Sequence, residues 1–177
     1  GIKNIFNTQI IFYDTPGSNL LKTNDITQKK LKTNIWQAID NVDLLVYLID
    51  VTKFNHDNIK IDIEKISESK KPIVIIFNKI DLIENNQTLP YINLLKENIN
   101  IIDFFLISAK YKNGIIDFLK YLDNKSYLGS WIYTNNEITD KDDIYISNEC
   151  TRNAILEYLH KEIPYNIEIS NVLFKFI

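Results

Sequence analysis

Two hydrophobic patterns alternate along the first two thirds of the chain. Nearly continuous apolar runs, typical of buried β-strands, occupy residues 8–14, 43–51, 73–78 and 103–108. Between them, apolar residues recur every three or four positions, as in amphipathic helices, over residues 20–39, 57–69, 88–98 and 115–122. This alternation predicts an α/β fold with a mainly parallel sheet and helices on both faces. The run 43–51 is so continuously apolar that we expect that strand to be buried on both faces.

The pattern changes after about Leu122. Residues 123–142 are polar and rich in turn-forming residues, and a helix is predicted over residues 143–161. The apolar residues expected to face inward from this helix are Ile144, Ala154, Ile155, Tyr158 and Leu159. Residues 166–177 have a strand pattern with no later strand to pair with, which is an unfavourable end for a domain.

Three parts are therefore expected. Residues 1–123 form an α/β domain that we expect to lack its N-terminal part, because the chain begins at Gly1 and runs almost directly into a strand. Residues 124–142 form a linker, and residues 143–177 begin a second, α+β domain that is truncated.

Composition excludes several classes of protein. The chain has 177 residues, 45% of them hydrophobic and 24% charged, as in ordinary globular proteins. The net charge of −3 does not indicate a nucleic-acid-binding protein by its overall balance. Cys150 is the only cysteine, which excludes an internal disulfide and a cysteine-rich metal site. No apolar run approaches the ~18 residues of a membrane-spanning helix, and a cytoplasmic location fits these features.

The first candidate site follows the apolar run that ends near Phe77. It reads Asn78-Lys79-Ile80-Asp81. An Asp81 carboxylate can accept hydrogen bonds from guanine N1–H and from its exocyclic amine, a donor pair that adenine lacks. Asn78 would brace the loop, and the Lys79 stem would lie across the purine face. The motif is weak alone, because a chain of this composition contains it by chance with a probability of about 0.2.

The second candidate site is Asp14-Thr15-Pro16-Gly17, which is more specific because Pro and Gly are scarce here. Its chance occurrence is on the order of 0.001. Asp14 stands at a predicted strand end, where it could hold a water bound to Mg²⁺. The backbone of Gly17 could approach a terminal phosphate closely. The alternative interpretation is a helix-entry turn built around proline.

Ser108-Ala109-Lys110 is the third candidate site, at the end of another predicted strand. A small residue there lets a backbone N–H reach the carbonyl oxygen of guanine. The alternative is an ordinary strand-to-loop transition. Because parallel sheets bind ligands at the carboxyl ends of their strands, three motifs in this order at three strand ends predict one nucleotide site.

Together these motifs resemble the bacterial Era family of ribosome-assembly GTPases. Glu137-Ile138-Thr139-Asp140, a helix with Glu149 and Arg152, and Glu162-Ile163-Pro164-Tyr165 resemble the entry into that family's RNA-binding KH domain. The resemblance implies a P-loop-type GTPase domain followed by the start of a KH-type domain. It also implies binding of GTP or GDP with Mg²⁺, binding to 16S-type rRNA and the 30S subunit, and peripheral contact with the inner membrane. We expect a monomer.

Parts of that family pattern are missing from this sequence. None of its four glycines is followed by lysine, so the chain has no GxxxxGK[ST] phosphate-binding loop. Ser18 follows Gly17 in place of the apolar residue expected there, and no general base is assigned. Hydrolysis by this chain is therefore left open. Two alternatives also stay open: a non-catalytic remnant, and another GTPase with the same Asp-Thr-Pro-Gly motif, of the Der or MnmE kind.

Overall fold

A computed structural model describes residues 1–15, 33, 35–84, 87–133, 141–158 and 169. The chain forms two compact units. One comprises Lys3–Ile132, and the other combines Gly1–Ile2 with Tyr133–Ile177. Each unit is described by itself below. No helix among the described residues is long and apolar enough to cross a membrane.

A three-stranded parallel sheet forms the centre of the unit Lys3–Ile132. It contains β3 (Leu45–Asp50), β4 (Ile73–Asn78) and β5 (Ile101–Ile107), in the order β3-β4-β5. The central strand β4 has almost no exposed surface except at its last residue. Its β-branched residues suit a strand that is covered on both faces.

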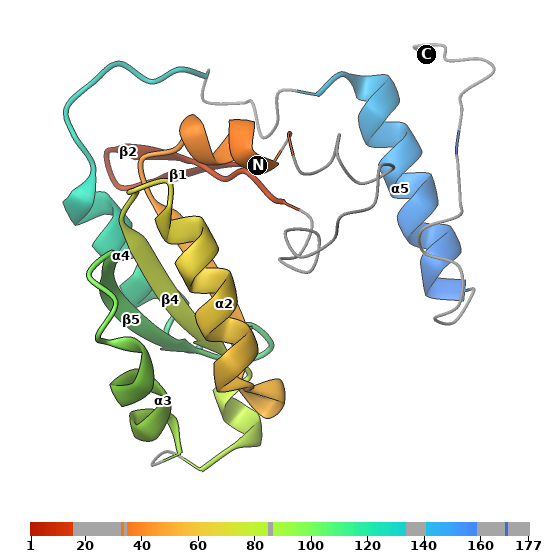
Figure 1. The fold of residues 1–177 in the computed structure, drawn as a ribbon. Coiled ribbons are helices and arrows are strands. Elements are labelled where there is room, and N and C mark those ends of the chain that lie inside the picture. Colours follow the sequence, from red (N-terminus) through yellow and green to blue (C-terminus); the bar gives the residue numbers. More distant parts are fainter. Residues whose placement is uncertain (16–32, 34, 85–86, 134–140, 159–168, 170–177) are drawn as a thin grey trace. The chain divides into compact units, whose positions relative to one another are not determined.

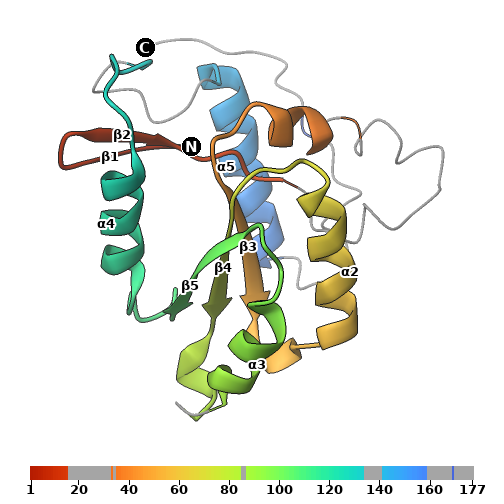
Figure 2. The ribbon, with the colours of Figure 1, turned by 60° about the vertical axis from the view of Figure 1, so that its left-hand side comes forward.

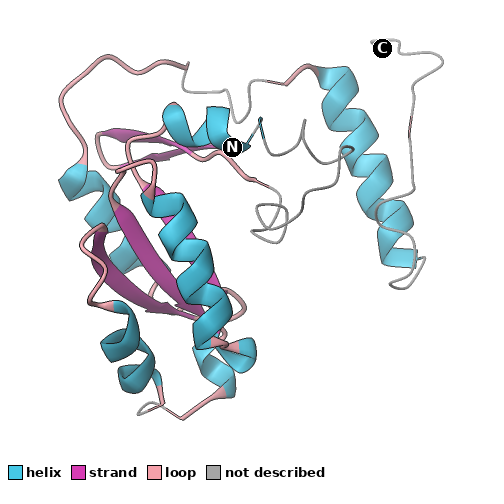
Figure 3. Cartoon of the chain, in the orientation of Figure 1, coloured by secondary structure: helices cyan, strands magenta, loops and turns pink. Residues whose placement is uncertain are grey.

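Helices cover both faces of this sheet, as the alternating pattern predicts (Figures 1 and 3). On one face, α2 (His56–Ser67) and α3 (Thr88–Leu95) pack over the side chains of Ile73, Ile75 and Phe77. On the other face, α4 (Ile115–Lys125) packs Phe118 against Val74 and Ile76. The predicted helices at 57–69, 88–98 and 115–122 are confirmed, with ends that differ by a few residues.

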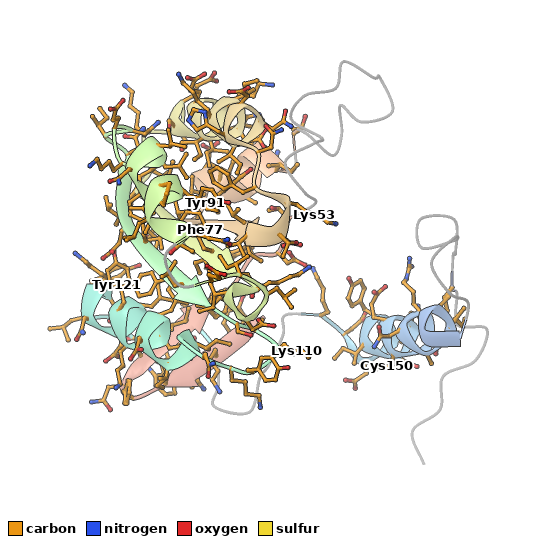
Figure 4. The ribbon with its side chains drawn as sticks, turned by 90° about the horizontal axis from the view of Figure 1, so that it is seen from below. Lys53, Phe77, Tyr91, Lys110, Tyr121 and Cys150 are labelled. Carbon is orange, nitrogen blue, oxygen red and sulfur yellow. The ribbon has the colours of Figure 1, made fainter. Side chains whose placement is uncertain are left out.

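An aromatic cluster supports the carboxyl end of β4. Phe77 packs near Phe54, Tyr91 and Phe104, and the rings of Phe54 and Tyr91 are stacked with centroids 3.8 Å apart. Figure 4 shows Phe77 and Tyr91 together in the interior of this unit. Because a packed ring fixes the backbone that bears it, the residue after Phe77 has a well-supported position.

The expectation that the strand within residues 43–51 is buried on both faces is wrong. β3 lies at the edge of the sheet, and the side chains of Val46 and Leu48 are 42% and 58% exposed. The opposite face of β3 is covered, since Ile49 belongs to the core beneath α2. The cluster around α4 reaches β4 and β5 and includes neither Val46 nor Leu48. An apolar run shows that a strand forms but does not show whether the strand is central.

The N-terminal strands form a separate two-stranded sheet. β1 (Ile2–Ile5) and β2 (Thr8–Ile11) are joined by a tight turn at Phe6-Asn7. Thr8 Oγ1 donates a hydrogen bond to Asp123 Oδ1 on α4 at 2.5 Å. The strand predicted at 8–14 is shorter than expected, because β2 ends at Ile11.

Of the predicted helix at 20–39, residues 35–39 are helical with Ile35 and Ile39 buried, and most of the rest lies outside the described residues.

Helix α5 (Asp143–Tyr158) is the described element of the second unit. The helix predicted at 143–161 therefore exists, but Ile144 and Ala154 are exposed and do not face inward as expected. Ile155 is half-buried. No other described element is available in this unit to cover the helix. The strand predicted at 166–177 lies outside the described residues, apart from residue 169.

Candidate functional site

The carboxyl ends of all three parallel strands meet at one edge of the sheet (Figure 2). Asp50 at the end of β3 is in register with Asn78 at the end of β4, and Asn78 is in register with Ile107 of β5. Asp50 and Asn78 are themselves polar, and the polar residue Ser108 follows Ile107. This edge is the general ligand-binding edge of parallel α/β sheets.

Asn78 joins β4 to the segment that follows β5. Its side-chain Oδ1 accepts a hydrogen bond from the backbone N–H of Ala109 at 3.0 Å. The same oxygen accepts from the backbone N–H of Lys79 at 2.8 Å. One amide oxygen thereby fixes the spacing between two of the predicted motifs. In this structure the Ala109 N–H is already used, so a guanine carbonyl oxygen would have to share that donor.

Lys79 joins β4 to β3. Its backbone is left-handed, with φ 66° and ψ 33°, a conformation that costs a non-glycine residue ~1 kcal/mol or more. Its ammonium Nζ lies 2.6 Å from Asp50 Oδ2. The other Asp50 oxygen accepts from Thr52 N at 3.0 Å and from Thr52 Oγ1 at 2.7 Å. The hydrogen bond from Lys79, followed by those from Thr52, lowers the pKa of Asp50 from 3.8 to about 2.

Asp81 is oriented by a buried serine. It lies in the short 3-10 helix η3 (Ile80–Leu82), immediately after Lys79. The Ser108 hydroxyl donates a hydrogen bond to Asp81 Oδ1 at 2.5 Å, and Ser108 has no exposed surface. Asp81 itself is exposed. Ser108 thus fixes one oxygen of the Asp81 carboxylate, while the exposed side of the carboxylate can accept hydrogen bonds from a ligand.

The loop after β5 is closed by its own backbone contacts. Ser108 N donates to Asn113 O at 3.1 Å. Gly114 then begins α4 with φ +74°, and a Cβ there would lie 2.3 Å from the carbonyl oxygen of Leu106. Lys110 extends outward, with its Nζ 5.1 Å from the ring centroid of Tyr111 (Figure 4). A glycine is required at this tight return for Ser108 and Ala109 to hold their positions.

The structure brings together five of the residues predicted from the sequence: Asn78, Lys79, Asp81, Ser108 and Ala109. Lys110 is adjacent and exposed. Asp14 lies exposed on the segment after β2, outside the contacts that join the others. Gly17 and Ser18 lie outside the described residues, so their predicted roles remain predictions.

Two residues of this network were missed by the sequence reasoning. Asp50 and Thr52 have the local spacing of an aspartate that caps a turn, a signal of local structure alone. The partner that gives Asp50 its place in the site, Lys79, is 29 positions away in the chain. Only the parallel pairing of β3 with β4 makes them neighbours.

Comparison with known proteins shows which GTPases this chain resembles. Residues 2–79 match the family model described as a 50S ribosome-binding GTPase. GTPase Era of Buchnera aphidicola subsp. Acyrthosiphon pisum (strain APS) is 37% identical over 179 aligned residues, covering 99% of this chain and 62% of that protein. GTPase Era of Ehrlichia ruminantium (strain Gardel) is 29% identical, covering 95% of this chain and 56% of that protein.

Two solved structures are also similar. One is Era in complex with MgGDPNP and nucleotides 1506–1542 of 16S ribosomal RNA, with a TM-score of 0.79 and 27% identity over 93% of this chain and 56% of that one. The other is a point variant of Aquifex aeolicus Era bound to GDP·AlF4⁻, with a TM-score of 0.78 and 26% identity over the same shares of both chains.

The chain spans 56% and 62% of the lengths of the two curated relatives described above. Within that span the fold is similar to that of the two Era structures over 93% of this chain. The chain is therefore similar to Era GTPases over nearly its whole length and has a P-loop GTPase-like fold.

Proposed function

We propose that this chain forms the guanine-selecting part of an Era-type GTPase. The observation that supports this most directly is the hydrogen bond from buried Ser108 to exposed Asp81, beside the bond between Asn78 and Ala109. Together they hold a carboxylate and a backbone loop ready at one edge of the sheet. Such preorganisation lowers the entropy cost of binding.

Asp81 distinguishes guanine from adenine in this proposal. Its carboxylate accepts from N1–H and the exocyclic amine of guanine, while adenine presents no such pair of donors. Lys79 lays its carbon stem against the face of the purine. The Ala109 N–H donates to both the guanine carbonyl oxygen and Asn78 Oδ1. The exposed Lys110 lies beside this contact. The selective contact is therefore concentrated in one residue.

Asp14 and Gly17 are proposed to act toward the terminal phosphate. Mg²⁺ retains several waters and is bound through one or two carboxylates together with nucleotide phosphates. Among the described residues, no group of three or more His, Cys, Asp or Glu side chains could hold a metal ion. The exposed Asp14 carboxylate fits a contact to Mg²⁺ made through a bound water. When bound, the ion would neutralise phosphate charge. We assign no hydrolytic step to this chain.

For the whole protein we propose action in small ribosomal subunit assembly through binding of 16S-type rRNA. The similar Era structure contains such an RNA together with MgGDPNP. The unit containing α5 would begin the KH-type domain, as the sequence predicts. A cytoplasmic location, peripheral membrane contact and a monomeric state stay predictions from the family resemblance. The relatives described above are Era proteins, which favours this reading over a Der-like or MnmE-like one.

Titration of the ¹⁵N-labelled 177-residue chain with GMP, AMP and XMP, followed by NMR, tests the proposal. We expect GMP to bind weakly, with a dissociation constant of ~1 mM, because most of the affinity for GTP comes from phosphate contacts. The shifted amides should include Lys79, Asp81 and Ala109. AMP should shift them little. Equal shifts with AMP and GMP, or none with GMP up to about 10 mM, would contradict the proposal.

Exchange of Asp81 for asparagine should redirect the selectivity. In Asp81→Asn the side-chain amide donates where the carboxylate accepted, so the variant should prefer XMP to GMP by about tenfold. Asp117→Asn, an exposed change on α4, is the matched control and should leave the GMP preference unaltered. A retained GMP preference in Asp81→Asn would remove Asp81 from the role of base reader.

A further inference from the structure

Asp50 stands at the end of β3 and pairs with Lys79. Neither the sequence motifs nor the proposed function gives Asp50 a role. We propose that Asp50 is a positioning residue for the purine: it holds the ammonium of Lys79 so that the Lys79 stem forms a fixed platform for the base. The inference rests on the proposed function, because it concerns the same site.

The first argument is the way in which Lys79 is held at both ends. At its backbone, Lys79 N donates to Asn78 Oδ1, and its φ of 66° sets the direction in which the side chain leaves β4. At its other end, Nζ lies 2.6 Å from Asp50 Oδ2, on the neighbouring strand. Since adjacent strands lie ~4.8 Å apart, the stem runs along the sheet edge from β4 toward β3. Asp81 follows Lys79 by two residues and is held by Ser108, the residue after β5.

The second argument is that Asp50 is itself fixed. Both the N–H and the hydroxyl of Thr52 bind Asp50 Oδ1, which leaves Oδ2 directed at Lys79. The Asp50 side chain is 25% exposed and that of Lys79 is 48% exposed, so the pair lies at the surface where a ligand can reach it. A lysine side chain loses considerable rotamer freedom when it is ordered. Because Asp50 already holds the Lys79 ammonium, the Lys79 side chain loses this freedom before the base binds.

The competing account is an ordinary surface ion pair. Exposed pairs commonly contribute ~0.2–1 kcal/mol to stability and often nothing measurable. Measurements of stability therefore distinguish poorly between an ordinary ion pair and a purine platform. Measurements of purine affinity distinguish them well. A platform beneath the ring contacts the purine face and does not read its hydrogen-bonding edge. Loss of Asp50 should thus weaken all purines that this site binds by the same factor and leave the base preference unchanged.

The experiment is the NMR titration of the 177-residue chain with GMP, extended to four proteins: wild type, Asp50→Asn, Lys79→Gln and the double variant. We expect Asp50→Asn to raise the GMP dissociation constant about three- to fivefold, the ratio that a coupling near 1 kcal/mol gives. In the Lys79→Gln background the Asp50→Asn change should have no further effect. Asp50→Glu, which keeps the charge, should recover part of the loss.

Two comparisons give the inference its specificity. Asp43→Asn removes an exposed carboxylate just before β3, at the end opposite Asp50, and should bind GMP as the wild type does. In the Asp81→Asn background, Asp50→Asn should weaken XMP binding by the same three- to fivefold. Circular dichroism should show the same folded content in every variant.

The outcomes separate this inference from the proposed function. A wild-type chain with no preference for GMP over AMP would refute the proposed function, and the inference with it. A wild-type preference combined with unchanged GMP affinity in Asp50→Asn would refute the inference alone. An equal loss from Asp50→Asn with and without Lys79 would also refute it, since Asp50 would then act by another route.

Discussion

Asp50 shows how much of a side chain's behaviour comes from its partners. An isolated aspartate has a pKa of 3.8, but the Lys79 ammonium and the two Thr52 donors lower the pKa of Asp50 to about 2. A carboxyl group whose pKa is lower in the folded state stabilises the fold at pH values above its unfolded pKa. That contribution is lost as the pH falls from about 4 toward 2.

A denaturant series between pH 7 and pH 2 measures this effect. The free energy of unfolding of the wild type should fall more steeply between pH 4 and pH 2 than that of Asp50→Asn, which has no carboxyl group to protonate. The two proteins should converge near pH 2. Asp43→Asn should follow the wild-type slope. Parallel curves for wild type and Asp50→Asn would show that the pair with Lys79 does not form in solution.

The residues of the site differ in how far the sequence could predict them. Asn78, Lys79 and Asp81 are adjacent in the chain, and guanine chemistry explains their types, so a single sequence suffices to propose them. The buried Ser108 was proposed as part of a motif, but its bond to Asp81 depends on how β5 lies beside β4. Asp50 required the fold, because Lys79 is distant in sequence.

At the scale of elements, β3 and β4 look alike as sequences and differ in the structure. Both are apolar runs that end on a polar residue, but β4 is central and β3 is an edge strand with two exposed apolar side chains. Periodicity shows which residues share a face, and neighbours decide whether that face is covered. For the same reason the order of helices and strands was predictable and their ends and burial were less so.

The junction between β5 and α4 gives a prediction at this scale. Gly114→Ala would place a Cβ 2.3 Å from the Leu106 carbonyl oxygen at a φ of +74°. Because that oxygen belongs to the strand backbone, it cannot move aside easily, and the change should cost about 2 kcal/mol or more. The melting temperature should fall by about 4–8 °C in a thermal denaturation experiment. Gly129→Ala, whose Cβ would meet only Tyr127 at 3.9 Å, should change it by less than about 2 °C. Equal melting temperatures for the two variants would show that the junction is not tight.

At the scale of the whole molecule, the contacts of the proposed base-recognition site belong to a single unit. The contacts that join Asp50, Lys79, Asp81 and Ser108 all lie within Lys3–Ile132.

The sequence pattern predicts a domain boundary near Asp123, whereas α4 continues to Lys125 and the unit continues to Ile132. Trp131 Nε1 donates to Asn7 O and Ile132 N donates to Gln9 Oε1, which explains why the segment after α4 belongs with the N-terminal strands. Contacts so distant in sequence leave no local pattern.

Shortening the chain tests this division. A protein of residues 1–132 should keep the amide shifts of Lys79, Asp81 and Ala109 and should bind GMP within about twofold of the 177-residue chain. The NMR titration described above measures both. Loss of dispersed amide signals on shortening would show that residues 133–177 are needed for the fold of the site.

The left-handed backbone of Lys79 has a consequence for protein engineering. Phe6, Lys70, Lys79 and Lys112 are the described non-glycine residues with positive φ. A routine stabilisation scheme would replace such residues with glycine or asparagine, which tolerate that backbone better. At Lys79 the same replacement would relax the chain and remove the cation that faces Asp50. Stability and ligand binding are opposed at this position, so Lys79 is the one of the four that a stabilised version of the protein should keep.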